Sequence, residues 1–487
     1  MASHNACSFG ELTMGSLLPF FQLFDLGTLS VSSVAPIFSV AAAGSVMAQA
    51  AGAAVPLAIV LIAIPFILCS WIFLSLNQHF PNAGASYHWS RRIIGIDFSN
   101  FQAWIIILAY FWSIPPILIP AAQFTYRALG IPHPGNLLQI LGAMFWAVFA
   151  LIVLLFGARM TARVTQIFLV IEVLSVAFMA VIGYAHWGPA AVGAADFSFS
   201  HLNWGGVIVC MVVAATIVDG WEIDSYASEE AKKPRITPGW GGIIGAVSVV
   251  AYYLLIWPLL LHQLPLDRLS TTSDTLSLWA GTVAPGLLPY FRIAIICSTA
   301  GSLWLTTFIL SRALYAMGRD GVMPNWVAGL NRFGVPHWPV VLPMGLSMIV
   351  VALQMFFPST RDLFNLVLSA AGFFLVGEFL LDGINMLVFL IRKHDAVHRQ
   401  VKAHHHLGLF VAAVCVVTSL TAVEVLFLIC GPKYVAAGVD QTVLTLLALG
   451  VVYVLWLKWR GKARSTHCFT PEELDNIAAV GPALVRE

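Results

Sequence analysis

Charged residues are scarce in this sequence. Asp, Glu, Lys and Arg make up 10% of the 487 residues, whereas a soluble domain usually contains about 25%. The formal net charge is +1, so there is no excess of basic residues of the kind that attracts nucleic acid. The composition argues against a soluble globular protein and gives no reason to expect a nucleic acid partner.

Cysteine is also sparse, and no cluster of metal ligands is evident. The 7 cysteines are scattered, mostly within apolar stretches, so no spacing indicates a disulfide framework or a zinc site. His, Asp and Glu do not recur at metal-binding spacing, and no nucleophile can be paired with a base. We therefore expect no resident metal, no cofactor and no enzymatic activity.

Apolar residues, by contrast, dominate the chain. They make up 59% of it and lie in long blocks, and a helix needs about 20 such residues to cross a bilayer. The pattern predicts an all-α polytopic membrane protein, in contact with lipid, with twelve transmembrane helices. The expected spans are 17–47, 53–76, 99–128, 136–156, 163–187, 205–230, 238–262, 290–316, 339–357, 362–391, 407–430 and 439–458.

Basic residues are distributed unequally between the two sides of these spans. With the N-terminus inside, 19 Lys and Arg residues fall at cytoplasmic ends and 5 at outer ends. Because cytoplasmic loops carry an excess of Lys and Arg, we expect both termini, residues 1–16 and the tail 459–487, to be cytoplasmic. The oligomeric state stays open.

Two predicted helices contain matching interruptions. The first carries Ser32-Ser33-Val34-Ala35-Pro36, and the sixth carries Val218-Asp219-Gly220-Trp221-Glu222. The breaks lie about 185 residues apart, which predicts two five-helix repeats, residues 17–187 and 205–391, followed by two C-terminal helices in 407–458. Because five is odd, the second repeat must be inverted. Broken helices at matching places in inverted repeats indicate a transporter's binding site; the alternative is two unrelated kinks.

The polarity of the broken ends suggests what could bind there. Pro36 suits the first position of an outward-running half-helix, so the free N–H groups of Ile37 and Phe38 would attract a carboxylate. The carbonyls of Ile217 and Val218 would end the opposing half-helix and attract an ammonium group. Such a site predicts a zwitterion, an amino acid or a related amine.

Three motifs resemble one known family. They are Pro81-Asn82-Ala83-Gly84-Ala85-Ser86-Tyr87, the helix 6 stretch Val218-Asp219-Gly220-Trp221-Glu222 followed by Ser228-Glu229-Glu230-Ala231-Lys232-Lys233-Pro234, and Ser311-Arg312-Ala313-Leu314-Tyr315-Ala316-Met317-Gly318-Arg319-Asp320-Gly321-Val322-Met323-Pro324. In this order they are similar to the amino acid–polyamine–organocation transporters, over roughly residues 15–460. The resemblance implies the leucine-transporter-like fold of five plus five helices. It also implies alternating access, with symport or exchange of amino acids or amines.

The resemblance places the substrate between the broken parts of helices 1 and 6, with walls from helices 3, 8 and 10. The candidate binding residues are Ser32, Ser33, Ala35, Pro36, Ile37, Tyr110, Trp112, Val218, Asp219, Gly220 and Trp221. The sequence departs from many members in three ways. The helix 1 break is not glycine-rich, Val218 stands where others have an aromatic gate, and Glu172 takes the place of a helix 5 lysine.

Ionisable groups within membrane segments are costly and are therefore functional candidates. We name Glu172, Asp219, Glu222 and Glu378 as candidates for ion coupling. Each has a structural alternative: Asp219 could fix the break by hydrogen bonding, Glu222 could cap a half-helix, Glu172 could be a buried neutral acid, and Glu378 or its neighbour Asp382 could face a solvent vestibule.

Proton coupling is the leading hypothesis, and two others of the same fold remain beside it. A sodium-coupled symporter is one, because Cys297, Ser298, Thr299 and Ser302 could contribute to a cation site. A polyamine or organocation exchanger is the other.

Overall fold

The fold comes from a computed structural model, which describes residues 17–195, 202–353, 360–392, 403–434 and 438–461. No β-strand occurs in these residues. Nine helical stretches among them are long and apolar enough to cross a membrane, and two shorter apolar helices accompany them. The expected all-α membrane architecture is therefore confirmed. The termini 1–16 and 462–487 lie outside the described residues.

The α-helices range in length from 4 residues in α10 to 33 residues in α16. In chain order they are α1 (Leu23–Val34), α2 (Pro36–Ala51), α3 (Val55–His79), α4 (Ala85–Ile93), α5 (Ile96–Ser113), α6 (Pro115–Ala128), α7 (Asn136–Leu155), α8 (Ala158–Ala185), α9 (Trp204–Val218), α10 (Ile223–Tyr226), α11 (Thr237–Gln263), α12 (Leu266–Thr271), α13 (Thr275–Val283), α14 (Leu288–Arg319), α15 (His337–Leu353), α16 (Thr360–Arg392), α17 (Ala403–Tyr434) and α18 (Val439–Trp459).

Both predicted interruptions are present. Ala35 separates α1 from α2 in the left-handed backbone region, with φ of 47°, and Pro36 is the first residue of α2 as expected. The second break follows Val218, where Asp219 is extended and Gly220 has φ of 113°. A residue with positive φ cannot continue a right-handed helix, so each break ends one helix and allows the next to start.

The prediction of one helix over 17–47 was wrong at its start. Phe20 and Phe21 precede α1, and both backbone N–H groups donate to the Glu230 carbonyl at 2.7 and 2.8 Å. The Lys232 N–H in turn donates to the Phe21 carbonyl at 2.9 Å. This pairing with a segment 200 residues away takes the backbone groups that a longer helix would have used.

The predicted helix 99–128 is also divided. It ends as α5 at Ser113 and resumes as α6 at Pro115. Pro115 and Pro116 lack backbone N–H groups, so the hydrogen-bond ladder cannot continue through them. The short helices α4, α12 and α13 lie in connections for which no helix was expected.

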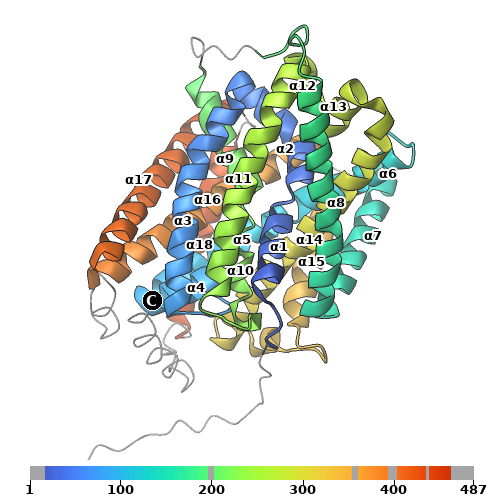
Figure 1. The fold of residues 1–487 in the computed structure, drawn as a ribbon. Coiled ribbons are helices and arrows are strands. Elements are labelled where there is room, and N and C mark those ends of the chain that lie inside the picture. The colour runs from blue at the N-terminus through green and yellow to red at the C-terminus, as the bar shows by residue number, and fades with distance from the viewer. Residues whose placement is uncertain (1–16, 196–201, 354–359, 393–402, 435–437, 462–487) are drawn as a thin grey trace, which may run out of the picture.

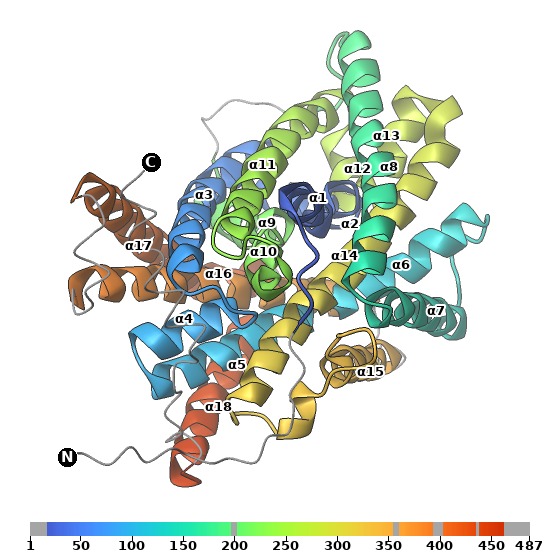
Figure 2. The same cartoon turned by 60° about the horizontal axis from the view of Figure 1, so that its bottom comes forward.

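The broken helices lie in the middle of the bundle. α1 packs against α8, α11 and α14, while α2 packs against α9. Figure 2 shows α1 between α11 and α14, with α16 and α5 beyond α10. α4 and the C-terminal end of α14 lie at one end of the bundle, and α12 and α13 lie at the other (Figure 1). We refer to these as the α4 end and the α13 end.

Candidate functional site

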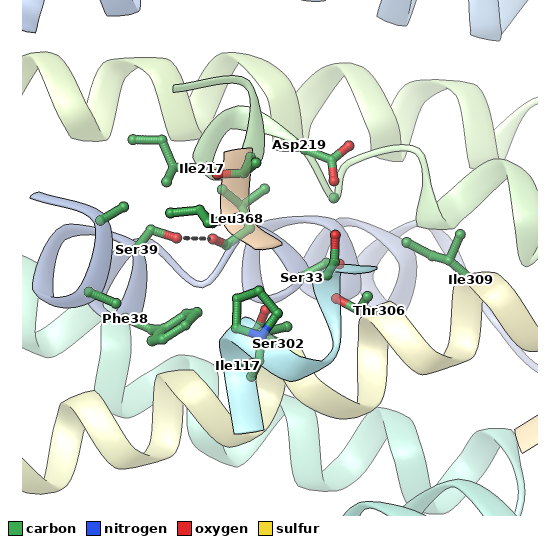
Figure 3. Close-up of a pocket in the computed structure, with 17 residues that line it drawn as sticks. Ser33, Phe38, Ser39, Ile117, Ile217, Asp219, Ser302, Thr306, Ile309 and Leu368 are labelled. Carbon is green, nitrogen blue, oxygen red and sulfur yellow. Dashed lines mark hydrogen bonds between the residues drawn. The ribbon is translucent and has the colours of Figure 1, made fainter. Parts of the chain in front are cut away.

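A cavity of about 50 Å³ lies between the two breaks. It is lined from α1 and α2, from the α9 end and its break, and from α5, α6, α14 and α16 (Figure 3). Its polar lining residues are Ser33, Ser39, Ser113, Thr216, Asp219, Ser302 and Thr306. The space would hold a few water molecules, so a solute larger than that requires the walls to move.

The two breaks touch each other because Gly220 has no side chain. A Cβ placed there would come within 2.9 Å of both the Ser33 carbonyl carbon and the Val34 nitrogen. Real Cβ atoms do not approach backbone so closely, so only glycine allows this contact. The contact holds the α1 end and the α9 end together at one side of the cavity.

The polar groups of the cavity wall are mostly hydroxyls. Six hydroxyl groups line it, and Asp219 is the only ionisable residue among the described residues of the wall. The Asp219 Oδ1 and Ser33 Oγ atoms are buried and have no hydrogen-bond partner among the described residues. Buried polar atoms normally have partners, so these two are groups that a bound solute could satisfy. A carboxylate beside hydroxyls suits an ammonium or hydroxyl donor.

The backbone groups at the breaks are more occupied than the sequence suggested. The Phe38 N–H was expected to be free, but it donates to Ser298 Oγ at 3.0 Å. The Ile217 carbonyl was expected to be open, but it accepts from the Tyr253 hydroxyl at 2.7 Å. Side chains from α14 and α11 thus satisfy groups that were expected to bind the solute directly.

Glu222 stabilises the second break. Its Oε2 accepts the Gly220 N–H at 2.9 Å, and its Oε1 accepts the Tyr110 hydroxyl at 3.0 Å. The carboxyl groups of Asp219 and Glu222 also face each other. Tyr110 therefore belongs to the site through Glu222 rather than through the cavity wall.

The other predicted binding residues divide into two groups. Ser33, Asp219 and Gly220 line the cavity, whereas Ser32, Ala35, Pro36, Ile37 and Val218 are buried in the breaks without lining it. Trp221 is stacked on Phe379 with ring centroids 5.3 Å apart and is buried outside the cavity. Trp112 packs on Phe111.

Sequence reasoning missed several lining residues, above all Ser39, Thr216 and Thr306. Thr306 lies four residues after Ser302, so both occupy one face of α14. The four-residue spacing from Ser302, a candidate for cation binding, could have identified Thr306 from the sequence. Thr216 and Ser39 gave none, because single hydroxyl residues are ordinary in membrane helices.

The predicted coupling acids occupy two regions. Glu172 of α8 is buried and faces Ser298, the residue that accepts the Phe38 N–H. Glu378 and Asp382 of α16 are both buried, so neither meets a solvent vestibule in this structure. The Glu378 Oε1 accepts the Tyr226 hydroxyl at 2.6 Å, close to Glu222 rather than to Glu172.

Apolar spans around two broken helices, with a polar cavity between the breaks, define a membrane transport protein. The chain belongs to a particular family of this class, because the family model described as "Amino acid permease" matches residues 20–455. It is a multi-pass membrane transporter and not an enzyme.

Characterised relatives are distant in sequence. The branched-chain amino acid permease BcaP of Lactococcus lactis is 25% identical over 403 residues, which cover 75% of this chain and 80% of that one. The cationic amino acid transporter 4 of Mus musculus is 24% identical, over 69% of this chain and 55% of its own length. The methylthioribose transporter of Bacillus subtilis is 23% identical, over 65% and 70%.

Proposed function

We propose that this protein is a secondary active transporter that moves amino acids or related amines across the cell membrane by alternating access. The observation that carries the proposal is the cavity between two broken helices, with Asp219 and Ser33 holding unsatisfied polar atoms toward it. Unpaired polar groups at membrane depth are tolerated only beside protein or a water-filled space, and they favour a polar solute.

The proposed substrate site includes the residues of both breaks and the hydroxyls of α14. Asp219 would accept an ammonium group, and Ser33, Ser302 and Thr306 would bond the remaining polar atoms. The relatives named for branched-chain and cationic amino acids support an amino acid as the solute.

The architecture we propose has twelve spans in two inverted five-helix repeats, with both termini cytoplasmic. α1 with α2 and α9 with α10 would be the equivalent broken helices of the two repeats. In this orientation the α4 end faces the cytoplasm. Arg91, Arg319 and Lys458 lie in helices there, in agreement with the excess of basic residues on the inner side.

Proton coupling is the mechanism we favour. Glu172, Glu222 and Glu378 are buried and form no ion pair with Lys or Arg in the part of the chain that the structure describes. Unpaired buried charges are costly, so such acids gain protons readily. Sodium-coupled symport is the alternative, and Ser298 beside Glu172 is the observation that favours it.

Uptake into proteoliposomes tests the proposal. Purified protein would be reconstituted and given labelled L-leucine, L-lysine or putrescine, with an acid exterior or with equal pH on both sides. We expect saturable uptake of at least one probe that rises with the pH gradient and persists when choline replaces sodium. Uptake that needs sodium supports the alternative, and no uptake or counterflow of any probe contradicts the proposal.

A further inference from the structure

A chain of buried acids and hydroxyls runs from the cavity toward the α4 end. We call it the acid chain. Its members, in spatial order, are Asp219, Glu222, Tyr110, Glu378, Tyr226, Ser86 and Asp382.

The upper part of the acid chain begins at the cavity. Asp219 lines the cavity and faces Glu222, whose Oε1 accepts the Tyr110 hydroxyl at 3.0 Å. The Tyr110 hydroxyl also lies next to Glu378. The Tyr110 hydroxyl therefore lies between one carboxyl group of the second break and one of α16.

In the lower part of the acid chain, hydroxyl groups again lie between two carboxyl groups. The Tyr226 hydroxyl donates to Glu378 Oε1 at 2.6 Å and is also a neighbour of Ser86. The Ser86 hydroxyl donates to Asp382 Oδ2 at 2.7 Å, and Gln102 donates to Asp382 Oδ1 at 3.0 Å. Ser86 belongs to α4, so this end of the acid chain lies at the α4 end of the bundle.

The acid chain extends from the cavity toward the α4 end of the bundle. Gln102 and Tyr110 lie eight residues apart on α5, which corresponds to about 12 Å at 1.5 Å per residue. Gln102 is in the second turn of α5, whose first residue is Ile96. The lower end is thus close to the end of the bundle, and the upper end is at the cavity.

Burial and the charges of the neighbouring groups favour protonated acids in this cluster. Glu222, Glu378 and Asp382 are fully buried, and none forms an ion pair with Lys or Arg within the described residues. Neighbouring carboxylates in a buried site cannot all stay charged. The Glu378 Oε2 atom is buried and has no hydrogen bond to any described residue, so it is available as an acceptor in the middle of the acid chain. Cys69 of α3 is a further titratable neighbour of Glu378 and Asp382.

We propose that the acid chain conducts the coupling proton between the cavity and the α4 end of the bundle. The proposal rests on the proton-coupled function proposed above and assigns its route. The Tyr110 O–H, which donates to Glu222 Oε1 in this structure, first turns toward Glu378. A protonated Glu222 then gives its proton to the Tyr110 oxygen as Tyr110 gives its own to Glu378. Tyr226 and Ser86 repeat the exchange toward Asp382. One carboxylic acid is lost at Glu222, one is formed at Asp382, and each hydroxyl is restored by rotation.

Two variants interrupt the acid chain away from the cavity. Asp382→Asn keeps the shape of the last acid but removes its proton exchange, and Tyr226→Phe removes one linking hydroxyl. The matched controls are Glu424→Gln, a half-buried acid on α17 whose buried Oε1 has no hydrogen-bond partner among the described residues, and Tyr184→Phe, whose hydroxyl donates to the Leu255 carbonyl. Neither control residue bonds to the acid chain.

Counterflow measures substrate exchange alone, whereas gradient-driven uptake also requires proton coupling. Full-length variants would be reconstituted and tested with whichever of L-leucine, L-lysine or putrescine the wild type exchanges. We expect Asp382→Asn and Tyr226→Phe to retain counterflow at equal pH. Their accumulation under an acid exterior, and the accompanying acidification of trapped pyranine, should fall to the equal-pH level, while both controls behave as the wild type. Gradient-driven accumulation at the wild-type level in both variants would overturn the proposed route.

A second readout does not depend on the substrate. Infrared difference spectra between acid and alkaline pH report the carbonyl stretch of protonated carboxylic acids. We expect Glu378→Gln and Asp382→Asn each to remove part of this signal and Glu424→Gln to remove a separate part. A signal unchanged in Glu378→Gln and Asp382→Asn would overturn the acid chain even if transport is confirmed. If the wild type exchanges none of the probes, the proposed function fails, and this measurement still decides whether the acids hold exchangeable protons.

Discussion

Gly220 is in backbone contact with Ser33, which lies nearly 190 positions earlier in the sequence. A Cβ at Gly220 would come within 2.9 Å of the Ser33 carbonyl carbon, and the Gly220 φ of 113° is itself unfavourable for any other residue. Any residue other than glycine at position 220 would therefore meet both the collision with Ser33 and the unfavourable φ. They make this glycine the point at which the two broken helices are held together.

We expect Gly220→Ala to destabilise the protein and to abolish transport. Strained backbone of this kind costs on the order of 1–3 kcal/mol, and the collision with Ser33 adds to it. Thermal unfolding in detergent measures the first effect and counterflow the second. Gly130→Ala is the matched control, because Gly130 also has positive φ but has no atom within 4 Å of an added Cβ. Equal effects of the two substitutions would show that the Ser33 contact is unimportant.

The ion pair between Arg312 and Glu230 is expected to stabilise the α4 end. Arg312 donates to both Glu230 oxygens, at 2.9 and 3.1 Å, and both side chains are at most 3% exposed. Removing one partner of such a pair leaves a buried charge and costs about 3–5 kcal/mol. Glu230→Gln should therefore lower the apparent melting temperature clearly.

An exposed ion pair on the same protein provides the comparison. Lys458 and Asp97 are 2.9 Å apart, but their side chains are 65% and 51% exposed. Exposed pairs contribute about 0–1 kcal/mol, so Lys458→Ala should leave the melting temperature almost unchanged. If Lys458→Ala destabilises the protein as much as Glu230→Gln, burial does not decide how much an ion pair contributes to stability.

Asp219→Asn tests the proposed recognition of an ammonium group. A hydrogen bond to a charged group contributes about 1.5–3 kcal/mol, which corresponds to a roughly ten- to hundredfold loss of affinity. We expect the KM for L-lysine or putrescine uptake to rise by such a factor. The protein should still fold, because Asn keeps the shape of Asp. An unchanged KM would place the amine elsewhere.

Thr306→Val tests the hydroxyls of α14. The substitution keeps the shape of the side chain but removes a hydroxyl that lines the cavity, and a neutral hydrogen bond contributes about 0.5–1.5 kcal/mol. We expect up to about a tenfold weaker interaction with the transported probe. Thr307→Val is the control, because the buried Thr307 hydroxyl donates to the Leu303 carbonyl within its own helix. Equal transport by the two variants would contradict the proposed wall.

The two helix breaks could be predicted from the sequence, because their signals are local. Pro36 cannot continue a helix from the preceding residues, and Gly220 allows positive φ. The expected start of helix 1 failed for the opposite reason. Phe20 and Phe21 pair with backbone near Glu230, and a contact with a distant segment leaves no trace in the local pattern.

The sequence by itself determined the membrane environment, the helical class and the position of both interruptions, because each depends on the length and polarity of one continuous segment. The tertiary structure decided which groups meet. Ser298 takes the Phe38 N–H across 260 positions, and Tyr110 reaches Glu222 across 112. These pairings depend on how helices pack side by side, and packing brings together residues whose order in the chain gives no measure of their distance in space.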